Sequence, residues 1–157
     1  MRVLVSACLL GVNCRYNGIP KENEAVKELL NREDIILIPV CPEQLGGLPT
    51  PRTPSERRGS LVVSSEGEDR TAAFARGAQE TLRIAKLYDC EVAILKERSP
   101  SCGNKEVYDG SFTGTVMPGE GVTAELLRKN GVKVFGESEL TLFFEYVRRI
   151  LDGVSVL

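Results

Sequence analysis

Short apolar runs alternate with longer mixed segments along the chain. Four of these runs are compact and rich in valine, isoleucine and leucine: 3–7, 35–40, 91–95 and 132–135. Runs of this length and composition predict buried strands. The segments between them place apolar residues at the spacing of one helix face, so the pattern predicts strands and helices in alternation.

The segment from Asp69 to Tyr88 has the clearest helical pattern. Its predicted apolar face carries Phe74, Ala78, Leu82, Ala85 and Tyr88. Gly77 lowers the helix propensity of this segment, and we expect it to allow a close approach of the helix to the sheet.

Three further helices are expected. The first follows Pro20 and has Val26, Leu29 and Leu30 at helical spacing. A short helix begins near a capping Thr123 and ends at Asn130-Gly131. The last presents a stripe of apolar side chains that suits packing against the sheet: Leu140, Phe143, Phe144, Val147, Ile150 and Leu151.

This order of elements predicts an α/β fold class. We expect a three-layer, doubly wound and mainly parallel sheet of about four to five strands. A chain of 157 residues lies within the usual size of one domain, so a single domain over residues 1–157 is expected.

Two segments break the alternation. Cys41 to Gly59 contains prolines at 42, 49, 51 and 54 and two adjacent glycines, and we expect it to be irregular. Long irregular segments in compact domains often serve as binding loops or lids, although a merely mobile surface excursion stays an alternative. The segment from Ser99 to Gly121 is rich in glycine and serine and is also expected to be irregular.

Composition narrows the class of protein. Hydrophobic residues at 42% and charged residues at 27% are typical of globular proteins, and no apolar stretch is long enough to span a bilayer, so no membrane partner is expected. A net charge of -2 disfavours nucleic acid as a partner, with transfer RNA not excluded. The first residues lack a secretory signal, which predicts a cytoplasmic location where the five cysteines stay reduced. The oligomeric state stays open.

Three cysteines follow predicted strands: Cys8, Cys41 and Cys102. Because the carboxyl ends of parallel strands meet at one edge of a sheet, we expect these thiols to converge there. Soft thiolate ligands in a chain with no histidine favour an iron–sulfur cluster over most other metals. Cys14 is a possible fourth ligand, whereas Cys90 precedes its strand at the opposite end and is expected to be structural.

Polar residues near these thiols are candidates for catalysis and binding. Glu43 follows Cys41 and is a candidate to accept and return a proton, with an ordinary solvated or capping role as the alternative. Ser99 and Ser101 flank a proline beside Cys102, where their hydroxyls suit either a substrate or the turn's own amides. Arg52 of the proposed lid is a candidate to hold an anion or a polarised oxygen, together with Arg15, Lys96 and Arg98.

The absence of histidine also excludes mechanisms. A Ser-His-Asp triad, a Cys-His dyad and a histidine-ligated zinc catalyst are impossible in this chain. The Walker lysine loop and the G-x-G-x-x-G fingerprint are missing too, so no nucleotide cofactor is indicated.

Several motifs together resemble the thiouracil desulfurase family, formerly a domain of unknown function. They occur in order over nearly the whole chain: Ser6-Ala7-Cys8-Leu9-Leu10-Gly11, Val40-Cys41-Pro42-Glu43-Gln44 with Pro51-Arg52, Ser99-Pro100-Ser101-Cys102-Gly103 and Tyr108-Asp109-Gly110. The resemblance implies a [4Fe-4S] cluster held by Cys8, Cys41 and Cys102. It further implies catalytic help from an acidic residue and a serine, for which Glu43 and Ser101 fit best and Ser99 is the rival.

The activity implied by this resemblance is hydrolytic desulfuration of a thiolated pyrimidine without net redox, releasing sulfide. A free base or small nucleotide is the expected substrate, and Ser99 and Arg52 are expected to contribute to its binding. The sequence leaves two alternatives open: a non-enzymatic iron–sulfur protein, and a zinc-binding or dithiol protein.

Overall fold

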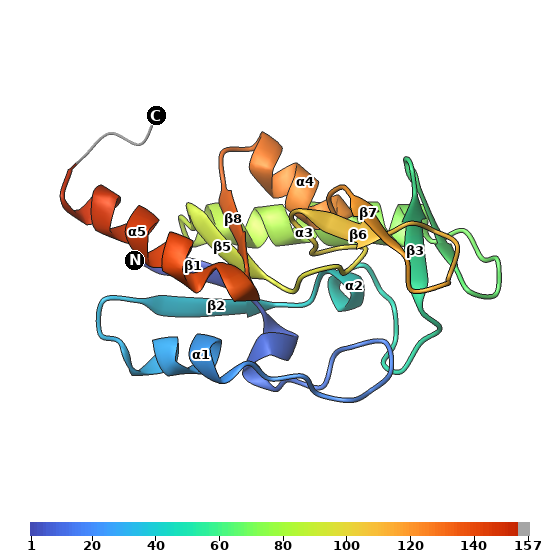
Figure 1. The fold of residues 1–157 in the computed structure, drawn as a ribbon, viewed down its shortest axis with the longest axis horizontal. Coiled ribbons are helices and arrows are strands. Elements are labelled where there is room, and N and C mark those ends of the chain that lie inside the picture. Colours follow the sequence, from blue (N-terminus) through green and yellow to red (C-terminus); the bar gives the residue numbers. More distant parts are fainter. Residues whose placement is uncertain (154–157) are drawn as a thin grey trace.

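A computed structural model of the chain, which describes residues 1–153, has a parallel four-stranded sheet at its centre (Figure 1). The strands lie in the order β2-β1-β5-β8, with bounds β1 Arg2–Ser6, β2 Ile36–Val40, β5 Val92–Leu95 and β8 Lys133–Gly136. All neighbouring strands pair in parallel. The predicted α/β class with a parallel sheet is therefore confirmed.

Helices and short 3-10 turns connect the strands. The helices are α1 Glu24–Lys27, α2 Pro42–Leu45, α3 Thr71–Leu87, α4 Val122–Lys129 and α5 Leu140–Leu151. The 3-10 turns are η1 Ala7–Leu10, η2 Glu28–Asn31 and η3 Glu137–Glu139. The first predicted helix is thus short and continues as η2, and Leu30 lies exposed rather than on a buried face.

The apolar side chains of the sheet divide between its two faces. Val3, Val5 and Ile94 pack with α1, α5 and the turn η1 on one face. Leu4, Ala93 and Leu95 pack with α3 and α4 on the other face. Because successive side chains of a strand point in opposite directions, each central strand contributes apolar side chains to both cores. The sheet therefore lies between two layers of helices, as predicted.

The strand β2 was predicted to be buried, but most of its residues are exposed or half-buried. It lies at the edge of the sheet, and Ile36 is 55% exposed. An edge strand has one neighbour only, so Pro39, which lacks an amide proton, is tolerated there.

Both segments expected to be irregular contain short antiparallel strands. β3 (Ser55–Arg58) pairs with β4 (Leu61–Ser64), and β6 (Glu106–Tyr108) pairs with β7 (Val116–Pro118). The helix α2 also falls within the first segment. Figure 1 shows β3 and the β6–β7 hairpin beyond the carboxyl ends of the central strands. The prediction of irregular chain was therefore wrong for α2, β3, β6 and β7, whereas β4 begins just after the first segment. These elements are three or four residues long and lie among prolines or glycines, so their pattern was hidden.

Gly77 allows a close contact, but the partner is α2 and not the sheet as expected. A Cβ atom on Gly77 would overlap the carbonyl oxygen of Pro42, and one on Gly46 would overlap that of Ala73. The backbones of α2 and α3 therefore touch directly, which fixes the position of the turn that follows β2.

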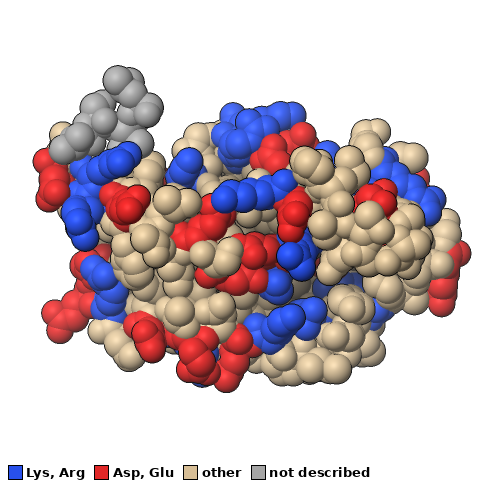
Figure 2. Space-filling model, viewed as in Figure 1, with Lys and Arg blue, Asp and Glu red and all other residues tan. Residues whose placement is uncertain are grey.

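Acidic and basic side chains are mixed on the surface shown in Figure 2, without one continuous basic area on that face. Within the described part of the chain, no helix has both the length and the apolar character required to cross a bilayer.

Candidate active site

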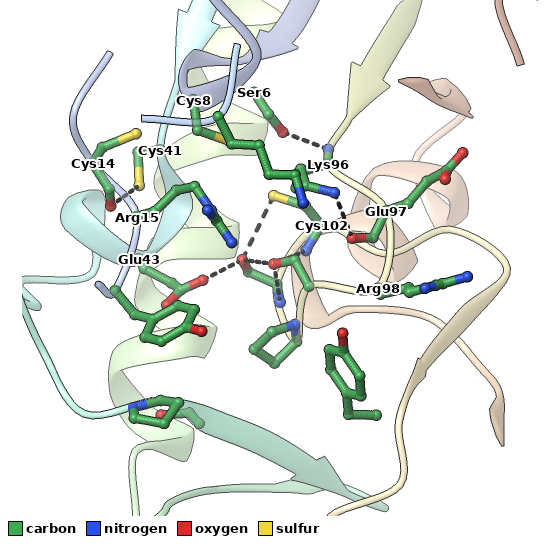
Figure 3. Close-up of a pocket in the computed structure, with 18 of the residues that line it drawn as sticks. Ser6, Cys8, Cys14, Arg15, Cys41, Glu43, Lys96, Glu97, Arg98 and Cys102 are labelled. Carbon is green, nitrogen blue, oxygen red and sulfur yellow. Dashed lines mark hydrogen bonds between the residues drawn. The ribbon is translucent and has the colours of Figure 1, made fainter. Parts of the chain in front are cut away.

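The three strand-end cysteines line one cavity of about 450 Å³. Cys8 follows β1, Cys41 follows β2, and Cys102 follows β5 through a turn. In Figure 3 the thiols of Cys8, Cys41 and Cys102 border a common space, with Glu43 on its far side. Parallel topology thus brings together three residues that are far apart in sequence.

Cys8 lies in the 3-10 turn that ends β1. Gly11 closes this turn with φ of 92°, a left-handed conformation that favours glycine, and its amide donates to the carbonyl of Cys8 at 3.1 Å. The turn buries Cys8 to 7% exposure while leaving it on the cavity wall.

Cys41 and Glu43 are both positioned by the short helix α2. Cys41 is the N-cap residue, Pro42 occupies the first helical position, and Glu43 lies in the first turn. Since α2 packs backbone to backbone on α3, the same contact fixes the position of this ligand candidate and of this acid/base candidate.

Cys102 lies in a turn held by its own serines and by α4. The Ser99 hydroxyl accepts from the amides of Ser101 and Cys102, each at 3.2 Å. The first amides of α4 donate to the carbonyls of Pro100 and Ser101. Ser99 therefore satisfies the turn amides, the role that stood beside substrate contact in the sequence analysis.

Glu43 receives hydrogen bonds at both carboxylate oxygens. The Ser101 hydroxyl donates to Oε2 at 2.9 Å, and Arg52 Nε donates to Oε1 at 3.1 Å. The hydroxyls of Ser99 and Ser101 are also 2.9 Å apart. The Glu43 side chain is 15% exposed, so the carboxylate is oriented by its neighbours and still reaches the cavity.

Arg52 is nearly saturated by the protein itself. Besides Glu43, its guanidinium donates to the carbonyls of Pro49 and Cys14 and to the Thr50 hydroxyl. Four of its five N–H groups are thereby used, and its side chain is 3% exposed. This geometry favours orientation of Glu43 over the direct substrate contact expected from sequence.

Cys14 also lines the cavity, and its backbone carbonyl accepts from the Cys41 thiol at 3.7 Å. Contact with the Cys41 thiol lowers the pKa of Cys14, but contact with the Cys8 thiol and burial outweigh it and raise this pKa to about 11. Contact with the Cys14 thiol and then burial raise the pKa of Cys41, and burial raises the pKa of Cys102 to about 12. Four thiols therefore share the cavity, and a bound metal would have to displace their protons.

Among the described residues, no group of three His, Cys, Asp or Glu side chains converges on a point where one metal ion would sit. A [4Fe-4S] cluster distributes its thiolates over separate irons, so its ligands need not share one point. Cys90 lies at the amino end of β5, away from this cavity, where the sequence analysis expected it.

The basic residues around the cavity differ in their partners. Lys96 pairs with Glu137 at 2.5 Å and Arg98 with Glu106 at 3.0 Å. Figure 3 shows the Arg15 side chain extending toward the space between Glu43 and Cys102. No carboxylate of the described residues lies within ion-pair distance of Arg15, so its charge is available to an anion in the cavity.

Glu56, Tyr108 and Phe112 are among the cavity residues that sequence reasoning left without a role in the site. Glu56 comes from β3, and Tyr108 and Phe112 come from the β6–β7 hairpin and its loop. Both segments were expected to be irregular, so no strand alternation was available to place these side chains. The Gly110 and Gly114 positions were the signal of a turn between two short strands.

The parallel sheet therefore places several strand-end thiols and the Glu43 carboxylate on the wall of a single cavity. The family model described as 2-thiouracil desulfurase matches residues 3–139, and the chain belongs to this family. The resemblance seen in the motifs is thereby confirmed.

Two relatives extend this assignment. The chain is 41% identical over 148 residues to the Bacillus subtilis protein YbbK, covering 88% of this chain and 97% of the relative. It is also similar to the solved structure of the [4Fe-4S]-dependent thiouracil desulfidase TudS, with a TM-score of 0.86 and 42% identity over 94% of this chain and 97% of that chain.

Proposed function

We propose that this protein is a [4Fe-4S]-dependent desulfidase that hydrolyses the carbon–sulfur double bond of a thiolated pyrimidine and releases sulfide. The observation that carries the proposal is one cavity lined both by Cys8, Cys41 and Cys102 and by the hydrogen-bonded pair of Glu43 and Ser101. The similarity to TudS supports the same cofactor class.

The donor set fits the cluster. Three buried or half-buried thiols come from three separate strand ends, and no histidine or carboxylate competes with them as a better donor for iron–sulfur chemistry. When held by three protein thiolates, such a cluster supplies one open iron as a Lewis acid for a thione sulfur.

The residues of the chain supply proton transfer and orientation. Glu43 takes a proton from a water molecule that attacks the ring carbon, and it returns a proton when the carbon–sulfur bond breaks. One water is consumed, the thione becomes a carbonyl, and hydrogen sulfide leaves, so no external electron donor is needed.

Ser101 and Arg52 hold the Glu43 carboxylate for this step. Each donates to a different oxygen, which leaves lone pairs of the carboxylate for water. Ser99 supports Ser101 through the contact between the two hydroxyls. Arg15 offsets negative charge that gathers in the cavity, including that of the departing sulfide.

The substrate we propose is a free thiobase or a small thionucleotide. A cavity of about 450 Å³ lies within the usual range for small-molecule sites. The proposed location is the reducing cytoplasm, where cysteines stay available as thiols.

The test is anaerobic reconstitution followed by incubation with 2-thiouracil. We expect iron and sulfide in cluster stoichiometry, visible thiolate-to-iron absorption, and conversion of 2-thiouracil to uracil and sulfide without added reductant. A fully loaded protein that releases no sulfide from 2-thiouracil, 4-thiouracil or their nucleosides would instead support a non-enzymatic cluster protein. A colourless protein that binds zinc alone would exclude the cluster.

A further inference from the structure

The loop between β6 and β7 lines the same cavity as the strand-end thiols. Tyr108, Phe112 and Gly114 of this hairpin line the cavity. Phe112 has φ of 57°, in the left-handed region that is costly for a bulky side chain. A residue in this conformation persists only where its surroundings hold it, so the loop must be fixed by its neighbours.

Glu56 of β3 supplies one of these restraints. Its Oε1 accepts from the amide of Gly110 at 3.0 Å and from the amide of Phe112 at 3.1 Å. Glu56 is 9% exposed and also lines the cavity. Two amides on one carboxylate oxygen fix the backbone of the turn from both sides of Ser111.

Arg58 supplies the second restraint from the same strand. Its Nε donates to the carbonyl of Gly110 at 2.8 Å, and its guanidinium lies 6.0 Å from the centre of the Phe112 ring. A side chain at Gly110 would overlap Arg58, and Gly110 has φ of 92°, so glycine is required for this contact. The strand β3 therefore holds the loop through its backbone and the Phe112 ring together.

We propose that Glu56 is a positioning residue that holds the turn carrying Phe112, next to Tyr108, as the wall receiving the planar pyrimidine ring. This inference rests on the proposed function, because it assigns the ring-binding side of the same site. Aromatic side chains stack favourably on the faces of nucleobases. The wall and the thiols border one cavity, so a ring held there can turn its sulfur toward the cluster site.

The first measurement is steady-state desulfuration of 2-thiouracil by cluster-loaded variants. Glu56→Ala removes the acceptor and is expected to raise KM about tenfold or more while kcat stays within about twofold, since the wall binds the ring and does not transfer protons. Glu56→Gln keeps an oxygen at the same place and is expected to restore KM to within about threefold of the wild type.

The second measurement uses uracil, which has the same ring without the sulfur. Its affinity for the loaded protein, measured anaerobically by calorimetry, gives the contribution of the wall to ring binding without a contribution from sulfur binding to iron. Glu56→Ala and Phe112→Ala are each expected to weaken uracil binding by about tenfold or more, the loss of roughly one stacking contact.

Glu139→Ala is the matched control. Glu139 also accepts from a backbone amide, that of Gly136 at 2.9 Å, and its side chain is 10% exposed, but it does not line the cavity. We expect this variant to lose stability without any change in uracil affinity or KM.

The outcomes separate the two proposals. The ring wall is refuted by wild-type uracil affinity in a folded Phe112→Ala protein or in a folded Glu56→Ala protein. A loaded wild-type protein that binds uracil in a Phe112-dependent way but releases no sulfide would support the wall and overturn the desulfidase proposal.

Discussion

Glu43 is the proposed general base, and its side chain is held in place by two neighbouring donors. Both of its oxygens accept a hydrogen bond, one from a hydroxyl and one from a guanidinium that has little freedom to move. A carboxylate fixed in this way does not need to reorient before it takes a proton from water, which is the condition for efficient general-base catalysis.

Glu43→Gln tests this role directly. The amide keeps the shape of the side chain but cannot accept a proton, so we expect kcat for 2-thiouracil to fall by about 100-fold or more. Iron content and visible absorption should be unchanged, because Glu43 is not a proposed ligand. Glu139→Gln, outside the cavity, is the control and should retain wild-type kcat. Wild-type kcat in Glu43→Gln would remove it from the mechanism.

The cysteines give a second prediction at the scale of single residues. Alanine at Cys8, Cys41 or Cys102 should each prevent stable cluster assembly, because only two of the three proposed ligands would remain. Cys90→Ala, at the other end of β5, should keep a full cluster. Anaerobic iron and sulfide analysis of the four variants decides the matter, and a full cluster in any of the first three contradicts the ligand set.

Cys14 lies in the cavity with the other three thiols, so it needs its own experiment. With three ligands sufficient, Cys14→Ala should retain a full cluster and desulfuration activity. Loss of iron from this variant would show that the cluster is closed by four cysteines, which is the arrangement of an electron carrier and not of a Lewis-acid enzyme.

At the scale of elements, apolar patterns in the sequence were enough to predict the strands of the parallel sheet. The runs at β1 and β5 lie in the middle of the sheet and are buried on both faces, so their apolar residues appear as continuous stretches. The convergence of Cys8, Cys41 and Cys102 followed from the parallel order of β1, β2 and β5.

The two hairpins were missed because their strands are only three or four residues long, too short to show a clear alternation of apolar and polar positions. β3 reads Ser-Glu-Arg-Arg, a composition that favours exposed chain. Its charges are satisfied across long sequence distances, since Arg57 donates to the Glu120 carbonyl and to the Glu125 carboxylate. Such partners are visible only in the folded chain, and the ring wall was missed with them.

The contact between α2 and α3 gives a prediction at this scale. Gly77→Ala places a methyl group on the Pro42 carbonyl, so α2 must shift and carry Cys41 and Glu43 with it. We expect a loss of about 1–3 kcal/mol in unfolding free energy, as for overpacked cores, together with reduced cluster occupancy and kcat.

Gly67→Ala is the comparison for this variant. Gly67 has φ of 83° and open space around it, so alanine costs about 1–2 kcal/mol of backbone strain without touching α2. Denaturant unfolding and iron analysis should show lower stability in both variants but iron loss in Gly77→Ala alone. Equal iron content in the two would mean that α2 does not position the cluster ligand.

At the scale of the whole molecule, an ion pair connects a hairpin that lines the cavity to a helix that covers the central sheet. Arg57 of β3 pairs with Glu125 of α4 at 3.0 Å, which joins the strand carrying Glu56 to the helix that holds the Cys102 turn. The hydrogen bond from Arg57 is the main cause that lowers the pKa of Glu125, and burial opposes it.

The last prediction follows from this lowered pKa. In the unfolded chain Glu125 takes up its proton near the ordinary value of 4.5, whereas in the folded chain it does so at lower pH. The pair therefore stabilises the fold fully above about pH 5.5, and this contribution is lost as pH falls through the folded pKa. Glu125→Gln should be less stable than the wild type near neutral pH by up to about 1 kcal/mol, the usual upper value for a partly exposed pair. Thermal unfolding of both proteins across this range should show the difference shrinking toward zero in acid, and a difference independent of pH would mean that charge does not join β3 to α4.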